Sequence, residues 1–423
     1  MSTTENECGC PGYGLSRRRF LGLTGAVLGA GAIATSTNGV FRQVALAAEG
    51  LLSDNVLVVL SLRGGADGLS MLVPYGDPAY YAARPRIAVP KSQLLVPDGF
   101  FGLHPAMSPL VPMWKAGRLT AVHAVGTPLP NRSHFAAMEE IEDADPGSAA
   151  RTGWLNRLIG IDSDRSPFQG VNVGSKMVPT ALMGPEPVLG FGRPEELRLP
   201  GARPPHPQAA WKRRALQEGW SGRPGALGAA ARSALDVTAN LPAGLADPPP
   251  TSGRYPAGAL GDSLSDTARL IRAQVGARVI ALDYGNWDMH TDLGTLTTGT
   301  MLLRLTELAQ GLAAFFDDLG TLSERVTVVT VSEFGRRVAE NGSGGVDHGY
   351  GNVVFVAGGG VRGGRVHAQW PGLAHGALVD GDLAVTRDYR SVLAEVVRAR
   401  FPVDVSQVFP RFQPEAPLGL MTG

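Results

Sequence analysis

Short apolar runs rich in valine, isoleucine and leucine recur along the chain, and they constrain its fold more than any other feature. Their length and composition are typical of strands that are buried on both faces of a parallel sheet. Helical patterns separate these runs, and this alternation indicates a doubly wound α/β sheet. The predicted strands cover residues 56–62, 119–125, 279–282, 326–331 and 353–356.

The segments between the strands have apolar residues at helical spacing, which is ordinary core packing. His104, next to Pro105, stands where the first of these helices begins. The predicted helices cover residues 104–116, 133–141, 263–275, 296–319 and 388–399.

Residues 184–261 break this alternation. The stretch carries many prolines, several arginines and few β-branched residues, and breakers at this density argue against central strands. We interpret it as an insertion or cap over one edge of the sheet, with a possible helix near residues 208–218. A linker between two domains is the alternative.

Paired arginines near the N-terminus predict an export signal. Arg17, Arg18 and Arg19 precede an apolar run at residues 21–34 and an Ala-Leu-Ala triplet at residues 45–47. The arrangement resembles a twin-arginine signal with its cleavage site, and the run is shorter than the ~20 residues of a membrane span. We therefore assign residues 1–48 to the signal and residues 49–423 to the mature domain, with an uncleaved anchor as the alternative.

The twin-arginine translocation machinery would deliver the mature chain, already folded and without a membrane span, to the periplasm or the cell exterior. Both cysteines, Cys8 and Cys10, precede the cleavage site, so the mature chain would have no disulfide and no thiolate metal site. A hydrophobic content of 44% and a formal net charge of zero describe a soluble globular protein. Because no basic block is present, we do not expect binding to nucleic acid.

Four polar clusters stand where predicted strands end or begin. Residues 63–68, 287–290 and 332–336 each follow a strand, and residues 347–349 come shortly before the last one. Open α/β sheets bind ligands outside the carboxyl ends of their strands. Carboxylates and imidazoles gathered at this edge predict one metal or acid/base site.

Two of the clusters offer a metal ligand directly after a strand. Asp288 and His290 are two residues apart, so in an extended segment they point to the same side and could share one ion. A hydrogen-bonded Asp–His pair is the alternative. Asp67 follows a Gly-Gly turn that leaves room for a ligand, although an Asp-Gly pair also occurs in ordinary turns.

The other two clusters leave more than one interpretation open. Asp347 and His348 are adjacent, so both reach one centre only if the backbone turns; otherwise they serve two ions, or one of them moves a proton. Glu333 could be part of the metal site, could orient a ligand histidine, or could form a structural ion pair with Arg336.

A fifth polar segment opens the helix predicted after residue 132. Arg132, Ser133 and His134 lie at a helix start, where an anion such as phosphate or sulfate binds favourably. Ser133 is also a natural N-cap, which is the default interpretation of its hydroxyl.

Together these stretches resemble the DUF1501 family, a group of exported bacterial proteins in the alkaline phosphatase-like, or sulfatase-like, superfamily. The resemblance implies a three-layer α/β/α fold with a mostly parallel central sheet and one or two divalent ions, Zn²⁺, Mn²⁺ or Ca²⁺, at the strand ends. It further implies Asp67 as the first metal ligand, Ser70 as the nucleophile, and the later Asp/His pairs as the remaining ligands. The matching stretches are residues 62–69, 132–135, 287–290, 332–336, 347–349 and 388–390.

Two departures from the family pattern bear on activity. Asp288 and His290 are closer in sequence than the corresponding pair of active relatives, and Ser70 is only three residues beyond Asp67.

Two functions are therefore compared. The first is an exported metal-dependent hydrolase of phosphate or sulfate esters, either small molecules or polysaccharides, in which Arg63 or Arg132 stabilises negative charge. Its nucleophile would be Ser70 or Ser133, with His134 beside it. The second is a non-catalytic metal-binding or assembly protein on the same scaffold. A hydroxyl that reaches the Asp/His cluster would distinguish the two.

Overall fold

The structure, a computed structural model, describes residues 54–148, 151–161, 168–197, 207–239, 241–247 and 253–422. The export signal predicted at residues 1–48 lies outside the described residues.

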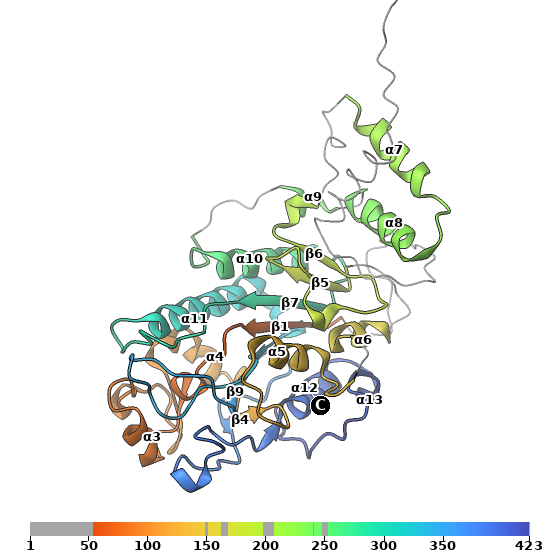
Figure 1. Cartoon of the computed structure of the whole chain (residues 1–423). Helices are drawn as coiled ribbons and strands as arrows, with labels where there is room; N and C mark the ends of the chain where they lie inside the picture. Colours follow the sequence, from red (N-terminus) through yellow and green to blue (C-terminus); the bar gives the residue numbers. More distant parts are fainter. Residues whose placement is uncertain are drawn as a thin grey trace, which may run out of the picture.

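Among the described residues, nine strands form one sheet through the middle of the molecule (Figure 1). All strand pairs are parallel except those that β9 makes with its two neighbours. Across the sheet the order is β10 (Val366–His367), β4 (Leu119–Gly126), β9 (Asn352–Gly358), β8 (Val326–Val331), β1 (Val56–Leu62), β7 (Val279–Tyr284), β5 (Gly170–Val173) and β6 (Leu189–Phe191), and β11 (Arg387–Asp388) also pairs with β4.

The direction of β9 corrects the sequence prediction. We predicted a parallel strand at residues 353–356, whereas β9 runs antiparallel to both β4 and β8. The connection from β8, residues 332–351, contains no helix to carry the chain across the sheet, so the chain turns back instead. As a consequence β9 begins at the edge where β8 ends, which brings residues 347–348 to the same edge as the other polar clusters.

Helices cover both faces of the sheet, which confirms the predicted fold class. Along β1, Val56, Val58 and Leu60 face one core, and Leu57 and Val59 face the other. The first face is covered by η2 (Pro105–Leu110), α4 (Val111–Lys115), α10 (Ala259–Arg272) and α11 (Thr300–Leu319). The second is covered by α5 (His134–Asp143), α6 (Trp154–Gly160), α12 (Tyr389–Arg400) and α13 (Val405–Val408).

Three predicted helices differ in detail from the observed ones. The helix predicted at residues 263–275 is α10, which begins at Ala259 and ends at Arg272. The segment at residues 104–116 begins as a 3₁₀ helix and continues as α4, and its start is capped by His104, whose Nδ1 accepts from Ala106 N. The long helix begins at Thr300 rather than at residue 296, because residues 295–298 form a hydrogen-bonded turn.

The shorter elements connect the main ones. They are α2 (Gly68–Met71), α3 (Pro78–Ala83), the hairpin of β2 (Leu72–Val73) with β3 (Gly102–Leu103), and the 3₁₀ helices η1 (Lys91–Gln93), η3 (Thr180–Leu182), η4 (Pro194–Glu196), η5 (Gly320–Arg325) and η6 (His375–Ala377).

Among its described residues, the proline-rich stretch at residues 184–261 contributes β6, at the sheet edge, the short η4, and the helices α7 (Ala209–Trp220), α8 (Gly225–Ala239) and α9 (Ala243–Ala246) before α10 begins. Helices α7 and α8 pack on each other through Trp220, Ala231 and Leu235 and lie beyond the β5–β6 end of the sheet (Figure 1).

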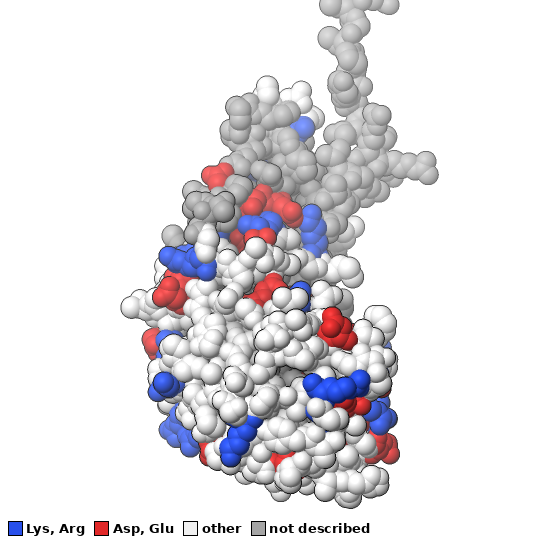
Figure 2. Space-filling view, turned by 90° about the vertical axis from the view of Figure 1, so that its left-hand side faces the viewer, with Lys and Arg blue, Asp and Glu red and all other residues white. Residues whose placement is uncertain are grey.

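Charges of both signs are interspersed over the face of the molecule shown in Figure 2. None of the helices in the described ranges is long and apolar enough to cross a membrane.

Candidate metal centre

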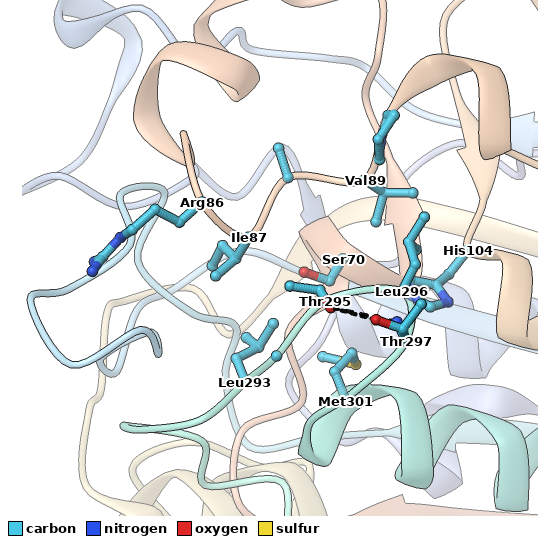
Figure 3. A pocket seen from close by; sticks show the side chains of 13 residues that line it. Ser70, Arg86, Ile87, Val89, His104, Leu293, Thr295, Leu296, Thr297 and Met301 are labelled. Carbon is cyan, nitrogen blue, oxygen red and sulfur yellow. Dashed lines mark hydrogen bonds between the residues drawn. The ribbon is translucent and has the colours of Figure 1, made fainter.

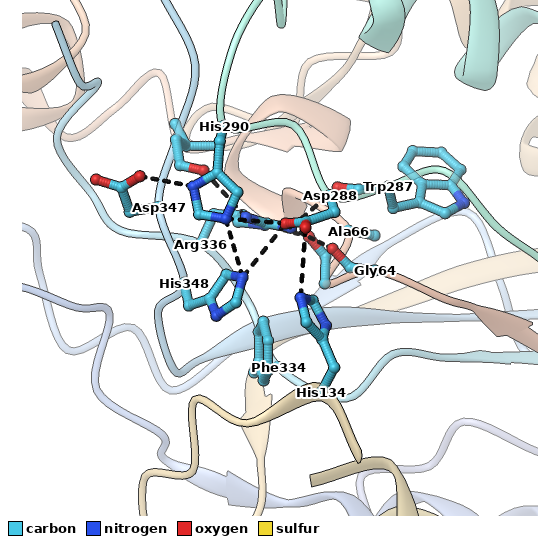
Figure 4. Close-up of polar contacts among 12 residues, drawn as sticks. Gly64, Ala66, His134, Trp287, Asp288, His290, Phe334, Arg336, Asp347 and His348 are labelled. Atoms are coloured by element: carbon cyan, nitrogen blue, oxygen red, sulfur yellow. Dashed lines mark hydrogen bonds and ion pairs between the residues drawn. The ribbon is translucent and has the colours of Figure 1, made fainter. Parts of the chain in front are cut away.

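The polar clusters meet at the carboxyl edge of the sheet (Figure 4). Three of the segments that meet there follow β1, β7 and β8, another precedes β9, and the last begins α5. Glycine permits their close approach. Gly64, with φ of 115°, packs so tightly on the next segment that a Cβ would lie 2.6 Å from the backbone nitrogen of Asp288.

Asp288 stands at the centre of three imidazoles. Its Oδ1 lies 3.1 Å from His290 Nε2 and 3.3 Å from His348 Nε2. Its Oδ2 lies 3.5 Å from His134 Nε2. The segment thus places Asp288 and His290 on the same side, and residues 134 and 348 come from distant parts of the chain.

The far nitrogen of each imidazole is held by an acceptor. Nδ1 of His134 donates to Glu333 Oε1 at 2.9 Å, and Nδ1 of His290 donates to Asp347 Oδ1 at 2.7 Å. Nδ1 of His348 donates to the backbone carbonyl of Arg132 at 2.9 Å. Carboxylate and carbonyl oxygens only accept, so each neutral ring carries its proton on Nδ1 and turns the lone pair of Nε2 toward Asp288.

This arrangement fits a divalent cation. Metal-binding histidines commonly donate their second ring nitrogen to a carboxylate or carbonyl, as all three rings do here. Ligands 2.0–2.1 Å from a tetrahedral Zn²⁺ lie about 3.3 Å apart, and the separations at Asp288 range from 3.1 to 3.5 Å.

Two further observations support the fit. Nε2 of His290 and Nε2 of His348 are 3.0 Å apart, so two lone pairs face each other, a repulsion that a cation between them would relieve. Nε2 of His134 is buried and has no hydrogen-bond partner among the described residues. The ligating atoms of His134, Asp288 and His348 all lie within 4.8 Å of one another. Those of Asp288, His290 and His348 lie within 3.3 Å of one another.

The charge of the centre suits a dication. Three carboxylates and the guanidinium of Arg336 leave two negative charges when the histidines are neutral. Burial raises the pKa of Asp288, but the hydrogen bond and the charge of Arg336, whose Nη2 donates to Oδ1 at 2.7 Å, hold it below its usual value. Hydrogen bonds from His290 and Asn341 lower the pKa of Asp347. Both carboxyls are therefore ionised at neutral pH.

Arg336 also fixes the shape of the centre. Its fully buried guanidinium donates to the carbonyls of Gly64, Gly65, Trp287 and Val346, which belong to three of the converging segments. We considered Arg336 from sequence only as a partner of Glu333, whereas the structure pairs it with Asp288 and leaves Glu333 to hold His134. Glu333 also accepts from Gly64 N at 2.8 Å.

Asp67 and Ser70 lie in a different cluster. Arg84 binds both Asp67 oxygens, at 2.5 and 2.9 Å, and the Ser70 hydroxyl donates to Asp67 Oδ2 at 2.6 Å. Burial alone would raise the pKa of Asp67, and the charge and hydrogen bonds of Arg84 overcome this effect and lower it. All three side chains are buried. Asp67 is not a member of the His134–Asp288–His348 group, and its oxygens are bound by Arg84 and Ser70.

The two arginines expected to meet an anion are already paired. Arg63 binds Glu142 at 2.5 Å and Asp283 at 2.8 Å, and Arg132 binds the fully buried Asp382. Ser133 occupies the N-cap position of α5, but its side chain makes no capping hydrogen bond, and the residue is exposed. Its hydroxyl is therefore not used in capping α5.

Sequence reasoning missed Arg84 and Asn341. Arg84 follows the short helix α3, and Asn341 donates to both the carbonyl of His290 and Oδ1 of Asp347. The Asn-Gly pair at residues 341–342 was a signal for the turn that holds Asn341 in place. Nothing in the local sequence signals Arg84.

The fold and the centre define an α/β protein with a histidine- and carboxylate-rich site at the carboxyl edge of its sheet. Residues 207–391 match the model of the family described as "Protein of unknown function (DUF1501)", which confirms the predicted resemblance for that segment. The match includes Asp288, His290, Glu333, Asp347 and His348, whereas residues 63–68 and His134 precede it. No curated protein matches the chain in sequence.

Several solved structures share a distant similarity. The crystal structure of Ps i-CgsB is 12% identical, with 84% of this chain and 74% of that chain covered and a TM-score of 0.36. The C-terminal periplasmic domain of EcEptC from Escherichia coli, in complex with Zn, is 10% identical, with 92% and 96% covered and a TM-score of 0.34. Alkaline phosphatase from the Antarctic bacterium TAB5 is 10% identical, with 74% and 94% covered and a TM-score of 0.28.

Proposed function

We propose that the protein is an exported, metal-dependent hydrolase of phosphate or sulfate esters, and that the DUF1501 resemblance extends over the whole mature chain. The observation that carries the proposal is the convergence of three histidine Nε2 atoms on Asp288, with each Nδ1 held by an acceptor. The twin-arginine motif supports export to the periplasm or the cell exterior.

Four side chains would hold the ion: His134, Asp288, His290 and His348. A divalent cation bound there would polarise an ester oxygen and make a water molecule more acidic. Glu333 and Asp347 keep two of the rings oriented, and the carbonyl of Arg132 keeps the third.

An ester can approach the centre from solvent, because the side chains of Asp288 and His290 are 46% and 43% exposed. Hydrolysis consumes one water, breaks the bond between the ester oxygen and phosphorus or sulfur, and releases an alcohol together with inorganic phosphate or sulfate. Ser133 is the hydroxyl that we assign to the attack or to positioning the water, because it is exposed and precedes His134. Ser70 is not suited to this role, because its hydroxyl is buried and bound to Asp67.

The test uses the full chain loaded with Zn²⁺ or Mn²⁺, with 4-nitrophenyl phosphate and 4-nitrophenyl sulfate as substrates. We expect release of 4-nitrophenolate and a loss of at least about 100-fold in kcat/KM for His348→Ala. His375→Ala, which changes an exposed histidine in η6, is the matched control and should keep wild-type turnover. Equal turnover by His348→Ala and wild type would contradict the proposal.

A non-catalytic metal-binding or assembly protein is the second candidate. It is favoured by the pairing of Arg63 and Arg132 with carboxylates, which leaves neither guanidinium free to stabilise a developing negative charge. Stoichiometric metal binding without turnover of either ester would select this function.

A further inference from the structure

A cavity of about 280 Å³ is lined by residues 86–90 and 293–297 together with Ser70, His104 and Met301, and none of the metal-centre residues lines it. Figure 3 shows most of the labelled side chains gathered around a common space, with Arg86 extending away from it. One wall is formed by residues 86–90 and the opposite wall by residues 293–297 and Met301. The second wall is held in shape by the hydrogen bond from Met301 N to Leu293 O at 3.0 Å.

Most of the lining is apolar. Ile87, Val89, Leu293 and Met301 are buried residues that face the cavity. The cavity opens to solvent beside Thr295 and Thr297, which are exposed. A molecule that fills this space would therefore bury apolar surface against these side chains and polar surface against the rest of the lining.

The buried His104 supplies a hydrogen-bond donor with no protein partner. The residue is 3% exposed, and its Nδ1 accepts from Ala106 N at 3.0 Å, so in the neutral ring the proton sits on Nε2. Burial lowers the pKa of His104 to about 4, which keeps the ring neutral at pH 7. Nε2 of His104 forms no hydrogen bond with any of the described residues, and His104 lines the cavity.

Ser70 supplies an acceptor on the same lining. Its hydroxyl donates its proton to Asp67 Oδ2 and accepts from Arg84 Nη1 at 3.1 Å, which leaves one lone pair available. The hydroxyls of Thr295 and Thr297 add groups that can donate or accept. A ligand hydroxyl could thus accept from His104 and donate to one of these oxygens.

The lining disfavours a charged ligand. Its one charged side chain, Arg86, already binds Glu340 at 2.5 Å and the carbonyl of Asn341. An ion placed in the cavity would lose its hydration without gaining a counter-charge.

We infer that this cavity is a binding site for a small, uncharged molecule with an apolar ring and one hydroxyl group, of the chemical class of simple phenols. Its size agrees, because an apolar cavity of about 150 Å³ holds benzene and this one is about 280 Å³. The site is independent of the metal centre and of any hydrolytic activity.

The experiment is isothermal titration of the full chain with 4-methylphenol, and with toluene as the probe that lacks only the hydroxyl. We expect saturable 1:1 binding of 4-methylphenol and an affinity for toluene that is lower by about tenfold, because toluene leaves the His104 donor unpaired. Equal affinities would show that the cavity is only an apolar void, and no saturable binding of 4-methylphenol would overturn the inference outright.

A substitution at His104 tests the role of its Nε2–H donor separately. His104→Asn keeps an acceptor for Ala106 N, because asparagine is a good cap, but removes the Nε2–H group from the cavity. We expect it to bind 4-methylphenol about tenfold more weakly and toluene as wild type does. His375→Asn, at an exposed histidine, is the control. If His104→Asn does not fold, Thr297→Val and the comparison of 4-methylphenol with toluene on the wild-type chain still test the inferred binding site. Unchanged selectivity for 4-methylphenol in His104→Asn would contradict the assigned donor.

Discussion

Glu333→Gln tests the effect of the negative charge of Glu333, because glutamine has nearly the same shape but no charge. In the wild type Glu333 Oε1 accepts from His134 Nδ1 and Gly64 N, and Oε2 lies 3.1 Å from the Ser332 hydroxyl. The glutamine oxygen can accept the first two bonds, and its amide can donate to Ser332. The variant therefore keeps the packing and removes only the negative charge that faces the His134 ring.

The expected magnitude follows from burial. Removing an outer partner of a ligand histidine typically lowers metal affinity by about 10–100-fold, or about 1.4–2.8 kcal/mol. The side chain of Glu333 is 3% exposed, so water screens its charge little, and we expect the upper half of this range. Asp347→Asn is the matched control at His290. Because the Asp347 side chain is 49% exposed, we expect its effect to be about tenfold or less.

Competition between the protein and a chromogenic chelator for Zn²⁺ measures both affinities, and circular dichroism confirms that the variants fold. A Glu333→Gln affinity equal to wild type, or a larger loss in Asp347→Asn, would refute the role assigned to Glu333.

Three further predictions concern the surrounding structure. Gly64→Ala should lose Zn²⁺ affinity by chelator competition, because a Cβ would meet the Asp288 nitrogen at 2.6 Å; unchanged affinity would contradict the packing argument. Asp67→Asn should lower the free energy of unfolding in urea by about 3–5 kcal/mol, because it leaves Arg84 buried without its partner. The folded pKa of Asp67 is lowered, so this difference is present at neutral pH and disappears as the pH falls through that folded pKa; a pH-independent difference would contradict it. Ser70→Ala should change ester turnover by less than about twofold, and a large loss would restore Ser70 as the nucleophile.

The sequence was informative about the sheet because buried strands leave a local signature. Each predicted strand corresponds to a strand of the sheet, and both faces of β1 are buried as its continuous apolar run indicates. The direction of β9 was not predictable from that run, because apolar composition does not encode direction. The missing helix in residues 332–351 was the available signal.

The candidate site was predictable in composition but not in pairing. The residue types at the strand ends identified Asp288 and His290, since parallel strands end at one edge. His348 was a candidate by residue type, but it reaches this edge only because β9 runs antiparallel. Which carboxylate holds which ring depends on contacts between distant segments: Glu333 and His134 are 199 residues apart, and Arg336 and Asp288 are 48 apart. Asp67 resembles a ligand in sequence, and only the tertiary contact with Arg84 shows that its oxygens are occupied.

The measurement that tests the central claim most directly is elemental analysis of the protein purified without chelators, beside the Asp288→Ala/His348→Ala double variant. We predict one bound zinc, manganese or calcium ion in the wild type, retained through gel filtration and lost in the folded variant. A folded wild type that stays metal-free after incubation with all three ions would contradict it, as would a variant that retains the ion.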